Sequence, residues 1–582
     1  SFSHRLDSMV RSSSLSVTAA HRLNARRFLV AAYLTAAGVA VLAATSVPDP
    51  FDLVIRHARI IDGSGGAWFR ADVGVRDGRI AAVGMLGGAA AVRTIDAEDR
   101  VLAPGFIDVH MHVEGNLPAR PDAENLVADG VTTVVTGNCG GSELDLDAWF
   151  TGLERDGIAI NLASFVGHNS VRTEVLGYAN RPPTAAEQQR MQALVARAMS
   201  AGAVGLSSGL IYSPGTFARP EEVAALARVA ASFGGIYATH MRSENDGLFA
   251  AIDEALETAR AAAIPLQISH YKVTAKKLWG SSPRMLSILE AARREGLDVT
   301  VDEYPYTASS SGLEVLLPDR VLQAEGSVRH ALVRRLANPA ARAAIGSEMR
   351  HRLEDELGRE HLDYGVVASA PWRPEIEGKD LRAINRGMGR PDVLESEIET
   401  VLDLCRMGAA SGRGSVCGTQ MVYHTMSEDD VERIFRHPLT MVARDGGVAA
   451  AGAGAPHPRS YGTCARVLAR FVRERSLVTL EEAVRKMTSL PAARFRFADR
   501  GLVKEGFRAD LVLFDPDTVE DLSRFEDPHH VSRGFDLVVV NGRIVREEGR
   551  ATCERPGMIL RRQLPISWPP RLAGAFVPSA RK

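Results

Sequence analysis

The chain has 582 residues, of which 45% are hydrophobic and 24% charged, and its formal net charge is −2. This composition is that of a soluble globular protein, and the length exceeds one ordinary core, so we expect one large domain with smaller attachments. The small net charge gives no electrostatic basis for a nucleic-acid partner. Five cysteines, scattered from Cys139 to Cys553, are too few and too far apart for a disulfide framework.

The first 47 residues differ from the rest of the chain. Arg22, Arg26 and Arg27 precede an uncharged run at residues 28–44 that is rich in Ala, Val and Leu. A basic region followed by an apolar run and small residues indicates an export signal, and the arginine pair partly resembles a twin-arginine signal. The run is shorter than the roughly 20 residues of a spanning helix, so an uncleaved N-terminal anchor is the alternative. We expect export to the periplasm, with a cytoplasmic location as the alternative and no other membrane contact.

Short strand-like runs separated by turn signals occupy both ends of the chain that follows the leader. They fill residues 48–103 at one end and 498–554 at the other, with clear apolar runs at 510–514 and 535–545. Two β-rich ends around a long middle suggest that the ends meet in one small β-domain, a β-sandwich. The remaining residues, 555–582, are proline-rich and form an expected surface tail.

Strands and helices alternate in the middle of the chain. The expected strands are 131–135, 202–208, 236–240, 266–270 and 299–303. The expected helices are 185–200, 221–233, 247–263 and 283–295. Repeated βα units predict a parallel sheet, and their number favours closure into a (β/α)8 barrel. An open, doubly wound sheet is the alternative, which the lack of a glycine-rich dinucleotide fingerprint weakens.

The βα series is interrupted after residue 317. Residues 318–415 are mainly charged helical sequence with one strand-like run at 364–369, which predicts an insertion beside the barrel that serves as a lid. The barrel is therefore expected in two parts, residues 104–317 and 416–497. Its second part begins with a helix at 428–436 and a strand that ends near 445.

Two histidines follow the apolar run that begins at Val101. His110 and His112 are two residues apart, so on an extended strand they point to the same face. An isolated pair of this kind is more often structural. Further candidates, however, stand at or just after separate expected strands: Cys139, His240, His270 and Asp445. The ends of parallel barrel strands open on one face, where active sites lie, and this mixture of donors suits zinc best.

Asp445 is the candidate most readily used as a base. A bound metal lowers the pKa of its water toward about 7, and a nearby carboxylate can pass the proton to a leaving amine. The structural alternative for Asp445 is a helix N-cap after its strand.

Eight motifs follow one another between about residues 51 and 546. They are GFIDVHMH at 105–112, DGVTTVVTGNCG at 129–140, LSSGLIYSPG at 206–215, THMRSE at 239–244, ISHYK at 268–272, DEYPYTASSS at 302–311, MSEDDVERIFRHPLTMVARDGG at 426–447 and HPRSYGTCARVL at 457–468. Together they resemble the amidohydrolase superfamily and, within it, the D-aminoacylase (N-acyl-D-amino-acid deacylase) family. The resemblance implies a TIM barrel, a small β-domain, an inserted lid and hydrolysis of N-acyl amides to D-amino acids and carboxylates.

The resemblance also implies roles for particular residues. Cys139, His240 and His270 would hold a tightly bound zinc ion, and Asp445 would be the general base and acid. His110 and His112, with Cys139 as a bridge, would form a second and weaker metal site. The positions that the family uses around its small-molecule substrate are Lys272, Tyr304, Ser310 and Arg459, with Tyr212 as a further pocket residue. The planar guanidinium of Arg459 suits the carboxylate of an acylated amino acid.

Two other functions stay open at this point. A cyclic amidase of the dihydroorotase or hydantoinase kind is one, although such relatives commonly bridge two metals with a carboxylated lysine where this chain has Cys139. A non-catalytic exported binding or scaffold protein is the other, and the presence of all six ligand candidates argues against it. The preferred amino-acid side chain, the acyl group and the oligomeric state are not determined by the sequence.

Overall fold

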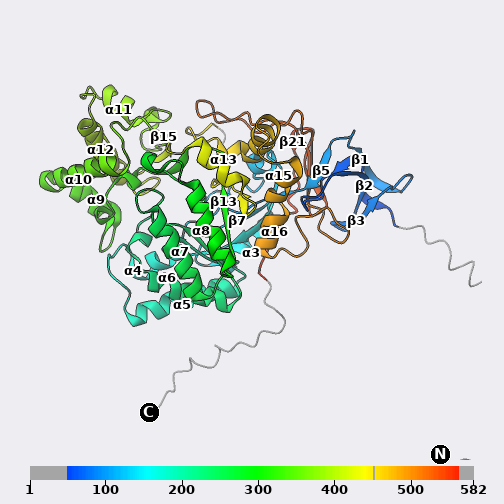
Figure 1. Ribbon diagram of the computed structural model, residues 1–582, viewed down its shortest axis with the longest axis horizontal. Coiled ribbons are helices and arrows are strands. Elements are labelled where there is room, and N and C mark those ends of the chain that lie inside the picture. Colours follow the sequence, from blue (N-terminus) through cyan, green and yellow to red (C-terminus); the bar gives the residue numbers. More distant parts are fainter. Residues whose placement is uncertain (1–48, 450–451, 563–582) are drawn as a thin grey trace, which may run out of the picture. The chain divides into compact units, whose positions relative to one another are not determined.

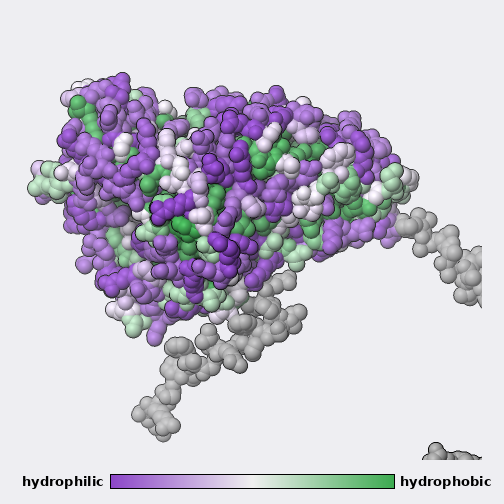
Figure 2. Space-filling view, viewed as in Figure 1, coloured by the Kyte–Doolittle hydropathy of each residue, from purple (hydrophilic) through white to green (hydrophobic). Residues whose placement is uncertain are grey.

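The computed structural model describes residues 49–449 and 452–562 (Figure 1). The expected export signal therefore lies outside the described residues. The elements below belong to one compact unit that begins at Phe51. Among the described residues, none of the helices combines the length and the apolar character needed to cross a bilayer. The face seen in Figure 2 is dominated by hydrophilic residues.

Both ends of the chain contribute to one nine-stranded sheet. β1 (Phe51–Ile60) pairs with β2 (Phe69–Arg76) and with β5 (Val101–Pro104), and β5 pairs antiparallel with β18 (Leu511–Phe514). The sheet is completed by β3 (Arg79–Gly84), β4 (Ala91–Asp96), β19 (Phe535–Val540), β20 (Arg543–Glu547) and β21 (Arg550–Ala551). Apolar side chains from both chain ends share one core, because each strand buries the side chains of one face. The two β-rich ends thus form one β-domain, as predicted.

The strands of the middle form two parallel sheets that join into a ring. Their members are β6 (Phe106–Asp108), β7 (Val131–Thr136), β8 (Asn161–Ser164) with its continuation β9 (Val166–Gly167), β10 (Gly205–Gly209), β11 (Ile236–His240), β12 (Leu266–Ile268), β13 (Val299–Glu303) and β17 (Thr440–Val442). At one junction the N–H of Val204 donates to Ser164 O (2.9 Å), and at the other the N–H of Asp445 donates to His110 O (2.8 Å). The predicted (β/α)8 barrel is confirmed, and the open sheet was the wrong alternative.

Helices connect and cover the barrel strands (Figure 1). They are α2 (Glu124–Val127), α3 (Leu146–Asp156), α4 (His168–Leu176), α5 (Ala185–Ser200), α6 (Pro220–Ser232), α7 (Leu248–Ala262), α8 (Ser282–Arg294), α13 (Glu428–Arg436), α14 (Arg459–Arg466), α15 (Leu480–Met487) and α16 (Ser489–Phe495). Local sequence explains where they begin. The side chains of Thr184 and Glu187 form a capping box at the start of α5, and Pro220 occupies the first turn of α6.

A separate group of elements lies between β13 and β17 in the chain. Its antiparallel sheet has β16 (Gln420–Tyr423) between β14 (Ser309–Gly312) and β15 (Gly365–Ser369). Its helices are α9 (Val328–Ala337), α10 (Pro339–His351), α11 (Leu381–Gly387) and α12 (Leu394–Ser411). These elements enclose an apolar core of their own, so we call this group, residues 309–423, the inserted subdomain. Its first and last strands in the chain, β14 and β16, lie just beyond the predicted limits of 318 and 415.

Candidate metal centre and active site

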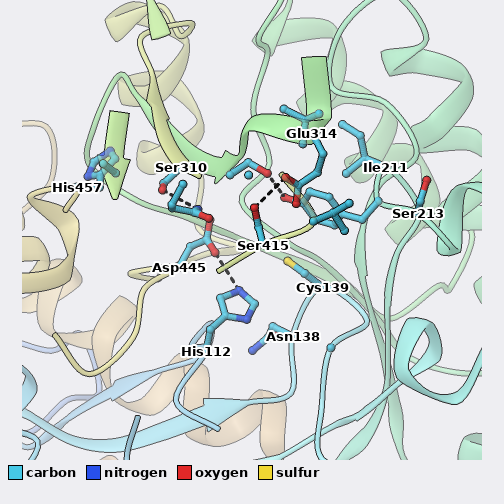
Figure 3. A pocket seen from close by; sticks show the side chains of 18 of the residues that line it. His112, Asn138, Cys139, Ile211, Ser213, Ser310, Glu314, Ser415, Asp445 and His457 are labelled. Carbon is cyan, nitrogen blue, oxygen red and sulfur yellow. Dashed lines mark hydrogen bonds and ion pairs between the residues drawn. The ribbon is translucent and has the colours of Figure 1, made fainter. Parts of the chain in front are cut away.

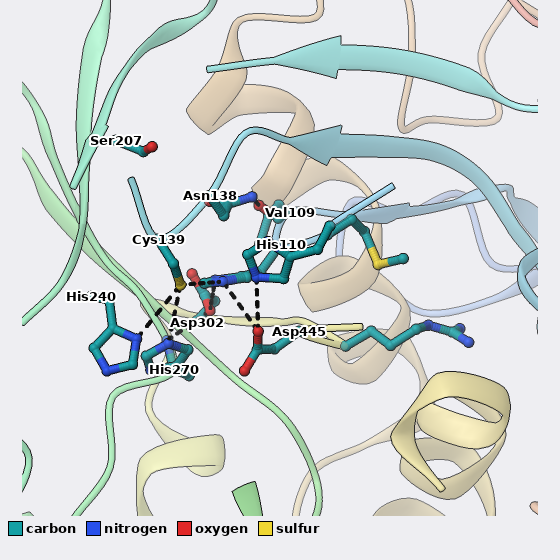
Figure 4. Close-up of polar contacts among 12 residues, drawn as sticks. Val109, His110, Asn138, Cys139, Ser207, His240, His270, Asp302 and Asp445 are labelled. Atoms are coloured by element: carbon teal, nitrogen blue, oxygen red, sulfur yellow. Dashed lines mark hydrogen bonds and ion pairs between the residues drawn. The ribbon is translucent and has the colours of Figure 1, made fainter. Parts of the chain in front are cut away.

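All six predicted ligands stand at or just after the C-terminal ends of barrel strands, and the structure brings them together. Figure 4 shows His110, Cys139, His240, His270 and Asp445, and Figure 3 shows His112. Their donor atoms form two groups that share the Cys139 sulfur. One group is Cys139, His240 and His270, and the other is His110, His112, Cys139 and Asp445. Within each group the donor atoms lie within 4.8 Å of one another. The strand-end signals in the sequence therefore identified side chains that are neighbours in space.

The backbone turns sharply at three of these residues. Cys139, His270 and Asp445 have φ values of 51°, 31° and 50°, in a region that non-glycine residues seldom adopt. Such a conformation costs about 1–3 kcal/mol and persists only where the surroundings impose it. Close packing imposes this conformation at Cys139. The chain passes so near Gly209 that a Cβ atom on that glycine would lie 2.1 Å from the Cys139 carbonyl oxygen. The turns direct the side chains from the strand ends into the barrel mouth.

The first group has the spacing of a zinc site. Cys139 Sγ lies 3.5 Å from His240 Nδ1 and 3.7 Å from His270 Nε2. Zinc bonds of about 2.3 Å to sulfur and 2.0–2.1 Å to nitrogen, at tetrahedral angles, place sulfur and nitrogen about 3.5 Å apart. The thiolate is the metal-binding form of cysteine. Burial alone would raise the pKa of Cys139, but the charge on His110 and hydrogen bonds from neighbouring histidines outweigh it and hold this pKa well below its usual value.

A buried carboxylate faces the outer nitrogens of the first group. Glu244 Oε1 lies 3.4 Å from His240 Nε2 and 3.0 Å from His270 Nδ1, and it accepts a 2.6 Å hydrogen bond from Lys272 Nζ. Carboxylates in this position fix the orientation and tautomer of metal-binding histidines. The sequence reasoning missed Glu244, although it stands four residues after His240 in the THMRSE motif. Lys272, expected beside the substrate, has its ammonium group 2.6 Å from Glu244 Oε1 and also 2.6 Å from His270 Nδ1.

The second group is arranged around the predicted base. His110 Nε2 lies 3.2 Å from Cys139 Sγ and 3.4 Å from Asp445 Oδ1, and His112 Nε2 lies 3.1 Å from the same oxygen. The outer nitrogen of His110, Nδ1, lies 3.3 Å from Asp302 Oδ1. Asp302, which opens the DEYPYTASSS motif, was also missed. Both groups therefore combine converging donors with a carboxylate behind a histidine, which fits a metal centre.

Asp445 connects the metal-ligand candidates to Arg459. Its Oδ2 lies 2.9 Å from Arg459 Nη2, while its Oδ1 faces the two histidines of the second group. Burial raises the pKa of Asp445, but the charges of Arg459 and His110 outweigh it, so this pKa lies well below its usual value. The carboxylate is therefore ionised, as a proton acceptor must be.

Arg459 and Tyr304 leave hydrogen-bond donors unused. The Arg459 guanidinium lies 4.4 Å from the centre of the Tyr304 ring, and both side chains are buried. Arg459 Nη1 and Tyr304 Oη have no hydrogen-bond partner among the described residues. Buried donors without partners are rare in folded proteins, so an acceptor from a ligand is expected here. Arg459 lines the cavity described next, whereas Tyr304 lies behind it.

A cavity of about 970 Å³ opens between the barrel mouth and the inserted subdomain (Figure 3). His112, Cys139 and Asp445 line one side, and Glu314 and Ser415 of the inserted subdomain line the other. The two remaining predicted pocket residues also border this cavity: Tyr212 and Ser310. The described residues thus place the donor groups at the bottom of a space large enough for a small-molecule substrate.

A third group of side chains has the donor types of a metal site but a different environment. His361, Asp392 and Glu397 lie in the inserted subdomain with donor atoms within 4.8 Å of one another. Arg382 Nε lies 2.7 Å from Asp392 Oδ1 and 3.8 Å from Glu397 Oε1. Its guanidinium already neutralises the carboxylates, so this group is an ion-pair network.

Comparison with known proteins identifies the family of this chain. The model of the amidohydrolase family matches residues 93–346 and 406–546. N-acyl-D-glutamate deacylase of Alcaligenes xylosoxydans xylosoxydans is 36% identical and aligns over 90% of this chain and 99% of its own length. D-aminoacylase of the same organism is also 36% identical, over 88% of this chain and 98% of its own length.

A crystal structure of N-acyl-D-glutamate deacylase from Bordetella bronchiseptica, complexed with zinc and a phosphonate inhibitor, superimposes with a TM-score of 0.75. It is 36% identical, and the match covers 88% of this chain and 100% of that one. Fold and sequence agree in one assignment. The chain belongs to the amidohydrolase family and, within it, to the D-aminoacylases, which are hydrolases of linear amides.

Proposed function

We propose that the protein hydrolyses N-acyl-D-amino acids to a carboxylate and a free D-amino acid, with zinc as its cofactor. The observation that carries the proposal is the position of Asp445, an ionised carboxylate between the converging metal-ligand candidates and a buried arginine with an unused donor. The deacylase and D-aminoacylase relatives support this substrate class.

Cys139, His240 and His270 would hold the zinc ion, and His110 and His112 would form a weaker second site that shares Cys139. A zinc ion bound there supplies Lewis-acid polarisation of an amide carbonyl and activation of a water molecule. The zinc complex of the Bordetella relative supports the choice of ion.

Asp445 would move the proton during the reaction. Its carboxylate takes a proton from the attacking water and returns it to the amide nitrogen, so that the new C–O bond forms and the C–N bond breaks with the amine leaving neutral. Arg459 holds one carboxylate oxygen and leaves the other facing the reaction centre.

Arg459 would also bind the α-carboxylate of the substrate through its unused Nη1, with the hydroxyl of Tyr304 as a second donor. Tyr212, whose ring centre lies 4.7 Å from that of His240, and Ser310 would shape the cavity around the amide. Lys272 would act through Glu244 and His270, because its ammonium group contacts both the carboxylate and the ring nitrogen of this proposed zinc ligand. For the leader, we propose export to the periplasm, which cell fractionation tests.

A substrate panel tests the proposal. The full-length protein, supplied with zinc, is incubated with N-acetyl-D- and N-acetyl-L-amino acids, and the released amine is measured. We expect amine from D-substrates only. Hydantoin and dihydroorotate are the matched cyclic substrates, and turnover of these without turnover of the linear amides would replace the proposal by a cyclic amidase. A zinc-free protein inactive on every substrate would indicate a scaffold.

A further inference from the structure

A second, smaller cavity of about 110 Å³ adjoins the large one. We call it the side chamber. Its apolar walls come mainly from the inserted subdomain: Val315, Leu316, Leu353 and Leu357. The barrel side adds charged groups, among them the ion pair of Glu244 and Lys272. At one end it reaches His240 and Asp445, and it shares Tyr212 with the large cavity. A space of this size beside the reacting groups admits one substituent of a substrate rather than the whole molecule.

Among the described residues, two hydroxyl groups on the wall of the side chamber have no hydrogen-bond partner. Tyr364 is only 7% exposed, and its Oη is a buried atom without a hydrogen bond within the described parts of the chain. Thr425 Oγ1 is in the same state. Burial raises the pKa of Tyr364 to about 12, so its hydroxyl keeps the proton and can donate it in a hydrogen bond. Polar atoms left unpaired in an apolar wall indicate that a ligand supplies the partner.

A guanidinium group lies beside the ring of Tyr364 in the chamber. Arg359 lies with its Cζ 4.4 Å from the centre of the Tyr364 ring, and Nη2 makes only a long 3.5 Å contact with His424 O. Among the described residues, no carboxylate forms an ion pair with Arg359. A second guanidinium, that of Arg352, lines the chamber at the start of a short π-helical segment, Arg352–Glu356, a feature that often occurs at functional sites.

We propose that the side chamber receives the side chain of the D-amino acid and selects one with a short aliphatic stem that ends in a carboxylate, as in D-glutamate. Apolar walls suit the stem, while Arg359 pairs with the carboxylate and Tyr364 and Thr425 donate hydrogen bonds to it. The inference rests on the proposed function. The relatives do not decide the matter, because a glutamate-directed and a general D-aminoacylase are equally similar to this chain.

The same chemistry could come from a dicarboxylic acyl group, such as succinyl. We assign the chamber to the amino-acid side chain. In the proposed function Arg459 binds the α-carboxylate, and the side chain branches from the same carbon. The experiment separates the two sources by placing the extra carboxylate on either half of the substrate.

The test compares kcat/KM of the full-length zinc enzyme for N-acetyl-D-glutamate, N-acetyl-D-glutamine and N-acetyl-D-methionine. N-succinyl-D-alanine is added because it carries the extra carboxylate on the acyl half. D-Glutamine matches D-glutamate in shape and lacks the charge. We expect a preference for D-glutamate over D-glutamine of about 10- to 100-fold, the range of hydrogen bonds to charged groups. Arg359→Met should remove most of this preference and change the value for D-methionine by less than about threefold.

Two further variants keep the result interpretable. Arg350→Met removes an arginine from the same subdomain that pairs with Glu354 and Glu395 on the surface, and it should leave the preference unchanged. Tyr364→Phe removes one hydroxyl and should lower the preference for D-glutamate by about threefold to tenfold.

A wild-type enzyme that turns over N-acetyl-D-methionine but shows no preference for D-glutamate, and no effect of Arg359→Met, would overturn the inference and leave the proposed function intact. If Arg359→Met lowered kcat/KM only for N-succinyl-D-alanine, the chamber would be assigned to the acyl group instead. Failure of the wild-type enzyme on every N-acyl-D-amino acid would reject the proposed function itself.

Discussion

The barrel mouth and the inserted subdomain face the same cavity but are built in different ways. At the mouth, donors follow directly from strand ends, and buried partners such as Glu244 and Asp302 stand behind them. In the inserted subdomain, Arg359 and Tyr364 come from the segment that leads into β15; among the described residues Tyr364 Oη has no hydrogen-bond partner, and Arg359 donates only through its long contact with His424 O. The family model matches the mouth but leaves out residues 347–405, within the subdomain. We infer from this difference that residues of the barrel mouth carry out the reaction and residues of the inserted subdomain select the substrate. Selectivity could then change while the reaction stays the same.

The largest expected effect separates chemistry from metal binding at the mouth. Asp445→Asn keeps the shape of the side chain but removes the proton acceptor, so kcat should fall by about 10³-fold, within the range of general acid–base catalysis. Zinc analysis of the variant should still find the tightly held ion, because Cys139, His240 and His270 are intact. Residual activity near that of the wild type would show that another group moves the proton.

The next effect tests the carboxylate that stands behind two of the predicted zinc ligands. Glu244→Gln removes the charge that faces His240 and His270 while keeping the size of the side chain. Loss of such a partner typically weakens metal affinity by about 10- to 100-fold, which zinc titration against a chelator measures. Zinc affinity equal to that of the wild type would mean that Glu244 serves only to bind Lys272.

A smaller effect is expected for substrate orientation. Arg459→Lys keeps a positive charge near Asp445 but loses the planar fork, so KM should rise about tenfold. Tyr304→Phe removes the second unused donor without touching Asp445, and it should raise KM by less than Arg459→Lys does. If KM stayed constant in both variants, the α-carboxylate would have to bind elsewhere.

The smallest effect concerns the third donor group. His361→Ala in the inserted subdomain should leave zinc content unchanged and kcat within about twofold, because His361 belongs to neither donor group at the mouth and lines neither cavity. A measurable loss of bound zinc would show that His361, Asp392 and Glu397 form a metal site despite Arg382 and would break the division between mouth and subdomain.

Several elements of the barrel were predictable residue by residue. The predicted strand bounds 236–240 and 299–303 and the predicted helix bounds 185–200 agree with β11, β13 and α5. Each is an apolar or capped run between clear turn signals. The strand predicted at 266–270 ends earlier, at Ile268, because His270 adopts a left-handed backbone conformation that a period of two cannot reveal.

The six ligand candidates were predictable as neighbours for the same reason, since parallel strands bring their C-terminal ends to one edge. Their roles as ligands stay predictions. Glu244 and Asp302 were not predicted, because each faces the far side of a histidine and the sequence does not show which side chains meet there, even though Asp302 lies at the end of β13.

The sequence by itself determined the alternation of strands and helices, the parallel barrel and the kinds of donor at its mouth, because these depend on local periodicity and on strand direction. Only the tertiary structure decided which carboxylate stands behind which histidine, and which donors of Arg459 and Tyr364 stay unpaired. It also decided that Val315, Arg359 and Thr425 enclose one chamber. Contacts between side chains far apart in the chain depend on how the inserted subdomain packs against the barrel, and no local pattern encodes that packing.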